Sequence, residues 1–322
     1  MASFLITGGA GFIGSHVAEH LLAHGHRITI IDDLNDFYTP QLKRDNLAEI
    51  GRAGSVHCHE LDICNTGRVF EVFDGLRPDV VIHLAARAGV RPSLEQPYLY
   101  ERVNVHGTMV LLEACRTFGV SKFVFASSSS VYGIADRVPF CEEDTSLLPI
   151  SPYAATKIAG EKICYTYSHL YAISAVCLRF FTVFGPRQRP DLAIRKFTEM
   201  IDRGEPIPIF GDGSTARDYT YIADIVSGIV AAAELDRSYE VFNLGNSAPV
   251  SLATMIHTIE QCLAKKAELR RLPLQPGDVP VTYADISKAE RLLGYSPATS
   301  FADGVAEFVR WHNRPKKAVA IA

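Results

Sequence analysis

One tyrosine and one lysine in the sequence are spaced for acid–base chemistry. Tyr153 and Lys157 stand four residues apart in the run Tyr-Ala-Ala-Thr-Lys, so in a helix both would lie on one face. A phenol has a reference pKa of about 10, and a nearby lysine cation favours the phenolate. The pair could therefore act as a base near neutral pH, although the same spacing also fits a solvated helix face.

A run of four serines, residues 127–130, precedes this pair. The run ends a predicted strand, and the tyrosine and lysine lie on the helix that follows it. Both should meet at the carboxyl edge of a sheet. There Ser128 could hold, by a hydrogen bond, the same substrate oxygen that Tyr153 deprotonates.

A glycine-rich turn follows the first predicted strand. Gly8, Gly11 and Gly14 have the spacing G-x-x-G-x-x-G, with Phe12 and Ile13 opening a helix between the last two. Glycine allows strained dihedrals and a close approach of the backbone to a pyrophosphate, which the helix amino terminus then faces. Strand-to-helix turns without a ligand also use glycine, so the pattern gains weight from an acid at the end of the second strand.

An acid stands where a dinucleotide site requires one. Asp32 ends the second predicted strand, eighteen residues after Gly14. A carboxylate there can bind ribose hydroxyls and would repel a 2′-phosphate, which favours NAD over NADP as the cofactor. Asp62 and Ile63 end the third strand, where an adenine could lie, although an ordinary strand end gives the same pattern.

The elements that must position these residues alternate along the first half of the chain. Short apolar runs predict strands at Ser3–Thr7, Arg27–Ile31, Val56–Leu61, Val80–His83, Phe123–Ser127 and Ser174–Arg179. Helical patterns occupy Phe12–Ala23, Thr66–Gly75, Tyr98–Phe118 and Pro152–Leu170. This alternation predicts a doubly wound α/β fold, a Rossmann sheet of parallel strands that binds ligands beyond their carboxyl ends.

The second half has a looser pattern. Helices are predicted near Ile194–Arg203, Ile222–Leu235, Ser251–Lys265, Ser287–Leu293 and Phe301–His312, between turns rich in Pro and Gly. We expect residues 1–186 to form the NAD-binding Rossmann domain. Residues 187–322 should form mainly a smaller α/β substrate-binding domain, with a segment near 225–250 returning to the first.

Composition excludes several classes of function. The 322 residues carry a formal net charge of -4 and are 48% hydrophobic, which predicts neither nucleic-acid nor membrane binding. The seven cysteines form no Cys-x-x-Cys pair, so we expect no metal site, and a reducing cytoplasm is the natural location.

Together these motifs resemble the extended short-chain dehydrogenase/reductase family over essentially the whole chain. The resemblance implies that Ser128, Tyr153 and Lys157 are catalytic, with Lys157 also binding the nicotinamide ribose. It places Leu84, Ala85 and Ala86 in the NAD site with the glycine turn.

Within that family the chain is most similar to UDP-glucuronate 4-epimerases. Sugar 4,6-dehydratases have an Asp-Glu pair after the catalytic serine and decarboxylases a Glu, whereas Ser129 and Ser130 stand here. Serine cannot replace a carboxylate base, which favours oxidation and re-reduction at one carbon.

The resemblance also implies a set of substrate-binding residues. The stretches around Arg91, from Thr182 to Arg189, around Arg217 and around Asp278 match those epimerases. Ser128, Ser129, Thr182 and Arg189 would contact the sugar, Arg189 its carboxylate, Arg217 the diphosphate and Asp278 the uridine. Arginine suits both anionic groups because it forms two parallel hydrogen bonds, although each arginine could instead form a surface salt bridge.

Alternatives remain open at this point. The substrate could be UDP-glucose or UDP-N-acetylglucosamine, the reaction could be decarboxylation of UDP-glucuronate, or the protein could be a non-catalytic NAD sensor. The family usually forms homodimers through paired helices, and residues 98–118 and 152–170 are the candidates here.

Overall fold

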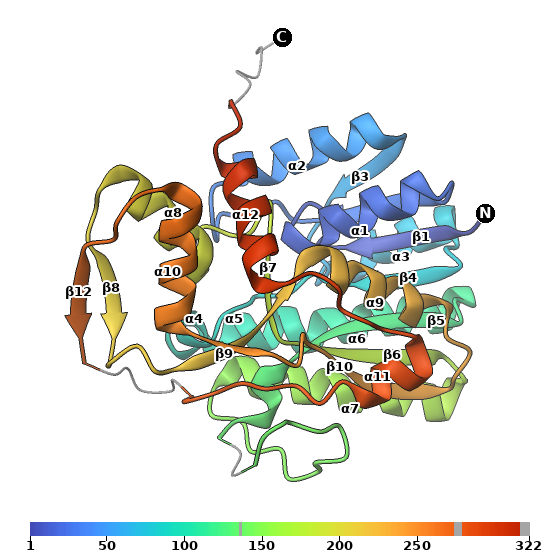
Figure 1. The fold of residues 1–322 in the computed structure, drawn as a ribbon. Coiled ribbons are helices and arrows are strands. Elements are labelled where there is room, and N and C mark those ends of the chain that lie inside the picture. The colour runs from blue at the N-terminus through green and yellow to red at the C-terminus, as the bar shows by residue number, and fades with distance from the viewer. Residues whose placement is uncertain (135–136, 274–278, 316–322) are drawn as a thin grey trace.

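Seven parallel strands form the main sheet of the structure, a computed structural model that describes residues 1–134, 137–273 and 279–315 (Figure 1). The strands are β1 (Ser3–Thr7), β2 (Arg27–Asp32), β3 (Val56–Glu60), β4 (Val80–His83), β5 (Lys122–Ser128), β6 (Ser174–Phe180) and β10 (Tyr239–Leu244). Their order in the sheet is β10-β6-β5-β4-β1-β2-β3. The predicted doubly wound α/β class is confirmed.

Helices cover both faces of this sheet. One face carries α1 (Phe12–Ala23), α2 (Pro40–Ala53) and α9 (Ile222–Glu234), and the other carries α3 (Thr66–Leu76), α6 (Gly107–Phe118) and α7 (Pro152–Tyr171). Side chains alternate accordingly along β1, where Ile6 packs in the core cluster of α1 and Leu5 in that of α3 and α6. Because both faces are covered, the strands are apolar throughout, which is why they could be predicted from short apolar runs.

A smaller lobe lies beyond the carboxyl ends of the strands (Figure 1). It contains the sheet β11-β9-β7 and the pair β12-β8. Its elements are β7 (Thr182–Phe184), α8 (Ala193–Arg203), β8 (Ile207–Phe210), β9 (Ala216–Tyr221), β11 (Pro249–Ser251), α10 (Leu252–Leu263), β12 (Leu269–Leu272) and α12 (Phe301–His312). Helices α8, α10 and α12 enclose its core around Phe184, Ile201 and Phe308.

The chain returns to the main sheet after entering the small lobe. Strand β10 pairs in parallel with β6, with Tyr239 opposite Ala175. Helix α11 (Ser287–Leu293) packs on α9 and β10. Sequence patterns predicted the five later helices but none of the small-lobe strands, because these have only three to six residues and lie among Pro and Gly.

Two helical segments differ from the sequence prediction. Helix α2 was not predicted, although Pro40 at its first turn is a typical start signal. The predicted helix at 98–118 is divided into α5 (Pro97–Glu101), a π-helical turn η1 (Arg102–His106) and α6, after a short helix α4 (Val90–Glu95). Among the described residues, none of the helices has the length and apolar character needed to cross a bilayer.

Candidate active site

A cavity of about 390 Å³ lies where the carboxyl ends of the strands meet the small lobe. All the predicted cofactor residues line it: Gly8, Gly11, Phe12, Ile13, Gly14, Asp32, Asp62, Ile63, Leu84, Ala85, Ala86, Tyr153 and Lys157. So do four of the predicted substrate residues, Ser128, Ser129, Thr182 and Arg189. The fold thus gathers one set of residues from strand ends that are distant in sequence.

The three glycines of the turn after β1 line the cavity. Gly8 has φ +71°, in the left-handed region. A Cβ on Gly14 would lie 2.3 Å from Gly8 O, so the helix packs directly on the turn. A Cβ on Gly11, in contrast, would meet only Gly8 O, at 3.1 Å, and would otherwise project into open space beside the cavity. Gly11 is the N-cap of α1 and has no side-chain acceptor, which leaves the first helical N–H groups for an anionic ligand.

Asp32 is held at the end of β2 by backbone donors. Its Oδ2 accepts from Ala10 N at 3.1 Å and its Oδ1 from Leu34 N at 3.0 Å. Burial raises its pKa, and the Lys43 cation, 3.9 Å from Oδ1, opposes that shift. Lys43 Nζ also donates to Asn35 O at 3.0 Å. The sequence pattern did not predict a cation beside Asp32, because it did not predict α2, the helix that carries Lys43.

Strand β5 and helix α7 bring the catalytic candidates together. Lys157 Nζ donates to Ala126 O at 2.8 Å and lies 5.9 Å from the centre of the Tyr153 ring. Burial lowers the Lys157 pKa to about 8. Burial also raises the Tyr153 pKa, while a hydrogen bond with Ser128 and the Arg189 charge lower it. Ser128 Oγ donates to Ser130 Oγ at 3.1 Å. The phenol, the hydroxyl and the ammonium therefore share one wall of the cavity.

A buried ion pair fixes that wall from behind. Arg179 on β6 donates through Nε and Nη2 to the Glu161 carboxylate, both at 2.9 Å. The two side chains are only 4% and 1% exposed. Glu161 Oε1 also accepts from Ser127 Oγ at 2.6 Å. Because Glu161 stands one turn after Lys157 and Ser127 precedes Ser128, this contact locks the lysine-bearing helix to the serine-bearing strand.

Arg189 reaches the cavity from the segment after β7. Its Nε and Nη2 donate to the two Asp191 carboxylate oxygens at 3.0 and 2.8 Å, and its guanidinium lies 5.5 Å from the centre of the Phe37 ring. The two hydrogen bonds raise the pKa of Arg189, against the effect of burial. The cation is thus fixed close enough to Tyr153 to affect its pKa.

Two of the predicted substrate residues lie away from the cavity lining, and a third is not described. Among the described residues, the cavity lining does not include Arg91 or Arg217. Arg91 lies in α4, with its guanidinium 5.1 Å from the centre of the Phe210 ring, and Arg217 Nη1 donates to Ala216 O at 2.8 Å. Asp278 lies outside the described residues. The structure therefore brings the four sugar-side candidates together in the cavity, whereas Arg91 and Arg217 do not line it.

The cavity also has lining residues that sequence reasoning missed. All are polar or aromatic, and they come from the residues after β2 and the loop after β4: Asp33, Asn35, Phe37, Tyr38, Lys43 and Arg87. Such loops give no periodic signal. The available signal was the density of charge and aromatic rings in residues 32–44.

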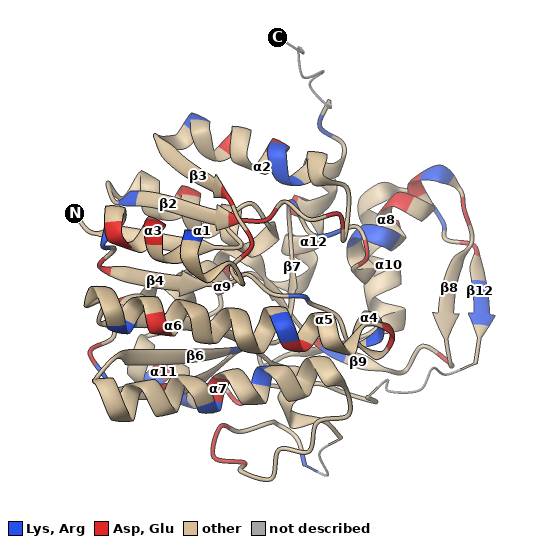
Figure 2. Ribbon diagram, turned by 180° about the vertical axis from the view of Figure 1, so that it is seen from behind, with Lys and Arg blue, Asp and Glu red and all other residues tan. Residues whose placement is uncertain are grey.

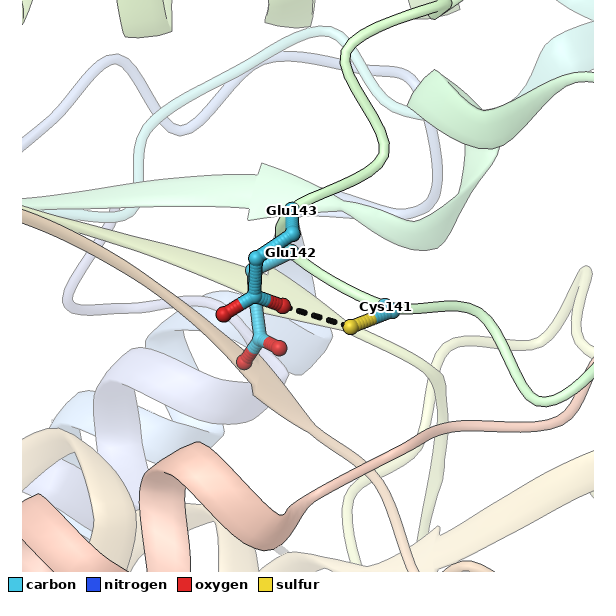
Figure 3. Close-up of side chains that lie close together, drawn as sticks. All are labelled: Cys141, Glu142 and Glu143. Atoms are coloured by element: carbon cyan, nitrogen blue, oxygen red, sulfur yellow. Dashed lines mark hydrogen bonds between the residues drawn. The ribbon is translucent and has the colours of Figure 1, made fainter.

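One cluster with metal-ligand side chains lies outside this cavity (Figure 3). Cys141 Sγ donates to Glu143 Oε2 at 2.5 Å, and Glu142 Oε1 accepts from Asn243 N at 2.7 Å. These contacts account for the side chains, and the cluster contributes nothing to the cavity.

Comparison with known proteins agrees with this geometry. Residues 5–308 match the family model described as GDP-mannose 4,6 dehydratase. The chain belongs to the NAD-dependent epimerase/dehydratase family of extended short-chain dehydrogenases/reductases. This agrees with the resemblance seen in the sequence.

Three relatives each align with this chain over nearly its whole length. The UDP-glucuronate 4-epimerase of Thermodesulfobacterium geofontis is 44% identical over 97% of this chain and 96% of its own. The structure of Bacillus cereus UDP-glucuronic acid 4-epimerase with UDP-glucuronic acid and NAD has a TM-score of 0.90 at 38% identity, covering 96% and 98%. The structure of Thermotoga maritima UDP-glucose 4-epimerase with UDP-glucose has a TM-score of 0.89 at 33% identity, covering 96% and 98%.

NAD is the cofactor of this protein, as the sequence predicted. The residues at the cofactor end of the cavity fit NAD. The open space beside Gly11 allows a diphosphate to approach the amino terminus of α1. In addition, Arg87 Nε is buried without a hydrogen-bond partner among the described residues, which leaves a donor for an anion.

Proposed function

We propose that this enzyme, an NAD-dependent UDP-sugar 4-epimerase, interconverts UDP-glucuronate and UDP-galacturonate. The observation that carries the proposal is that Arg189 and Thr182 line the same cavity as Ser128, Tyr153 and Lys157. A guanidinium beside the acid–base residues can hold a sugar carboxylate by charge-assisted hydrogen bonds.

We assign the following roles to the protein groups, which their position in one cavity supports. Tyr153 removes the proton from the carbon-4 hydroxyl, Ser128 binds the same oxygen, and the Lys157 charge favours the phenolate. Bound NAD supplies a reversible hydride acceptor. The 4-keto sugar turns over within the cavity, and Tyr153 then returns the proton, so no net oxidation occurs.

A uronate imposes an additional demand on the site. With carbon 4 oxidised, the sugar is a β-keto acid, which loses carbon dioxide most readily when the carboxylate bond stands perpendicular to the carbonyl plane. Arg189, already held by Asp191, can keep the carboxylate out of that orientation, with help from hydroxyls such as Thr182 or Ser128. The epimerase should therefore release little carbon dioxide.

The lining carboxylates argue against elimination and decarboxylation chemistry. Within the described residues they are Asp32, Asp33 and Asp62, all at the cofactor end of the cavity. Beside the catalytic serine stand Ser129 and Ser130, which line the cavity with hydroxyls. A dehydratase or a decarboxylase of this family would need a carboxylate at that place.

Neutral UDP-sugars remain the principal competing substrates, because the Thermotoga maritima relative is a UDP-glucose 4-epimerase. The test is to incubate the purified protein separately with UDP-glucuronate, UDP-glucose and UDP-N-acetylglucosamine and to identify the products by proton NMR. We expect UDP-galacturonate to form fastest. A UDP-pentose as main product would establish the decarboxylase, and faster turnover of a neutral sugar would overturn the uronate proposal.

We also propose that the protein forms a homodimer through paired helices. Large apolar side chains are exposed on α5, α6 and α7, with Tyr98 at 87%, Met109 at 41% and Tyr165 at 52%. Light scattering after size exclusion should give the mass of a dimer, and Tyr98→Glu should shift it toward the monomer. A monomeric wild-type protein would contradict the proposal.

The overall charge of the protein does not favour an anionic substrate, so binding must depend on charges at the cavity. Among the described residues, positions of both signs are mixed over the helices of both lobes (Figure 2). The net charge of -4 does not attract a UDP-uronate. Its affinity must therefore come from individual cations at the cavity.

A further inference from the structure

An ion pair crosses the cofactor end of the cavity. Arg87 Nη2 lies 3.6 Å from Asp33 Oδ2. Asp33 directly follows β2, and Arg87 comes four residues after β4. In the sheet, β1 lies between these two strands, and the glycine turn follows β1. The pair therefore joins the two loops on either side of the turn that receives the diphosphate, and both residues line the cavity.

Neighbouring groups hold each partner in place: Asn104 of η1 binds the Arg87 backbone, and Asn35 binds the Asp33 side chain. Arg87 N donates to Asn104 Oδ1 at 2.8 Å, and Asn104 Nδ2 donates back to Arg87 O at 3.0 Å. Asp33 Oδ1 accepts from Asn35 N at 3.1 Å. The side chains of Arg87 and Asp33 are 16% and 31% exposed, so solvent and salt screen this pair less than a surface pair.

The charges of the pair do not match a simple diphosphate-binding site. A guanidinium attracts a diphosphate, and Arg87 Nε still has no hydrogen-bond partner among the described residues. A carboxylate beside the same diphosphate repels it, so Asp33 would weaken NAD binding if it acted alone. The position of Asp33 is explained if this carboxylate holds Arg87 across the cofactor end of the cavity.

We infer that Asp33 and Arg87 form a clasp that closes over the diphosphate of bound NAD and slows the exchange of the cofactor. The inference rests on NAD being the cofactor and does not depend on which UDP-sugar is used. Slow exchange of the cofactor would serve this reaction. An epimerase must return the hydride to the same sugar, so loss of reduced cofactor in mid-cycle would strand the keto sugar.

The clasp is tested by NAD exchange in the purified holoprotein. Protein loaded with radiolabelled NAD is chased with excess unlabelled NAD, and the label that stays bound is measured after rapid gel filtration. Arg87→Met and Asp33→Asn should each release NAD about tenfold faster, as expected when one partner of a partly buried charge pair is removed. The double variant should release it no faster than the faster single variant. Arg77→Met, which removes an exposed pair with Asp74 before β4, is the matched control and should behave like the wild type.

The Asp33 variant decides between a clasp and a plain phosphate ligand. If Arg87 only binds the diphosphate, Asp33→Asn removes a repulsive charge and NAD leaves more slowly or at the same rate, which overturns the clasp. Association gives a second measure, because a clasp must open before NAD enters. Both variants should then bind NAD faster in stopped-flow experiments on the apoprotein, whereas loss of an attractive charge would slow association. Full NAD occupancy at saturation shows that each variant still folds and that the cofactor assignment holds.

Discussion

The two sides of the cavity are built in opposite ways. On the β5–α7 side, the buried Glu161–Arg179 pair, with side chains at most 4% exposed, fixes the strand and the helix that carry Ser128, Tyr153 and Lys157. At the rim of the cavity, the Arg189–Asp191 pair lies within one loop and the Arg87–Asp33 pair joins two loops, and their side chains are 16–43% exposed. Regular elements hold the groups that move protons, while loop charges surround the space where anionic ligands enter.

This difference has an energetic meaning. A buried pair cannot exchange partners without leaving a desolvated charge, so the catalytic wall is preorganised. A partly exposed pair loses less stabilisation when a ligand replaces one partner. Arg189 can therefore share its hydrogen bonds between Asp191 and a substrate carboxylate, and the rim can adapt while the wall stays fixed.

The largest expected effect concerns the wall. Tyr153→Phe removes the acid–base hydroxyl and keeps the ring that packs edge-on against Tyr100, with the ring centres 6.2 Å apart. We expect epimerase activity to fall by about 10²–10⁴-fold, as for loss of a positioned acid–base group, with NAD still bound. Turnover is measured by NMR and NAD content by absorbance of the released cofactor. Activity near that of the wild type would show that the wall does not carry the chemistry.

The buried pair behind the wall should control stability. Glu161→Gln leaves Arg179 charged in the interior, and removing one partner of a buried pair costs roughly 3–5 kcal/mol. Urea unfolding should show this loss. Glu71→Gln, which breaks an exposed pair with Arg68, should lower the free energy of unfolding by at most about 1 kcal/mol. Equal losses in the two variants would remove the contrast between wall and rim.

The same contrast explains what the sequence could predict. The glycine turn, Asp32 and the Tyr153–Lys157 pair were readable because strand ends and helix faces place side chains by simple periodicity. The Arg87–Asp33 contact was not, because it joins loops whose conformations depend on tertiary packing. The Lys43–Asp32 contact was not, because helix α2, which carries Lys43, was not predicted. The strands of the small lobe were not predicted for a related reason: they are short, and they form by pairing between distant segments.

Arg189 tests the rim directly. Arg189→Ala should lower kcat/KM for UDP-glucuronate by roughly 10- to 100-fold, because a hydrogen bond to a charged group contributes about 1.5–3 kcal/mol. Activity on UDP-glucose, which has no carboxylate, should fall much less. Arg203→Ala, which breaks an exposed pair with Glu205, serves as the control. An equal loss on both sugars would assign Arg189 to the diphosphate or to the fold.

Cofactor choice gives a smaller effect, at the cofactor end of the cavity, where Lys43 and Asp32 form a buried pair. We predict that the wild type prefers NAD, because the Lys43 charge beside Asp32 is already matched by that carboxylate. Asp32→Asn leaves Lys43 as a cation for a 2′-phosphate, so the ratio of NADP to NAD affinity should rise by about tenfold. Calorimetry on the apoprotein measures both affinities. Asp62→Asn, at the adenine end of the same cavity, should leave the ratio unchanged, and equal affinities in the wild type would refute the preference.

The smallest effect couples rim to wall through charge. The Arg189 cation lowers the Tyr153 pKa, opposing the rise caused by burial. Removing the cation therefore raises that pKa, and a higher pH is needed to form the phenolate that acts as base. In Arg189→Ala, the acid limb of kcat/KM for UDP-glucose should move to higher pH, and Arg189→Lys should largely restore its position. UDP-glucose is the right substrate here because it has no carboxylate to lose a contact, so a shift of the limb reports on the phenol alone. An acid limb that stays in place would show that rim and wall act independently.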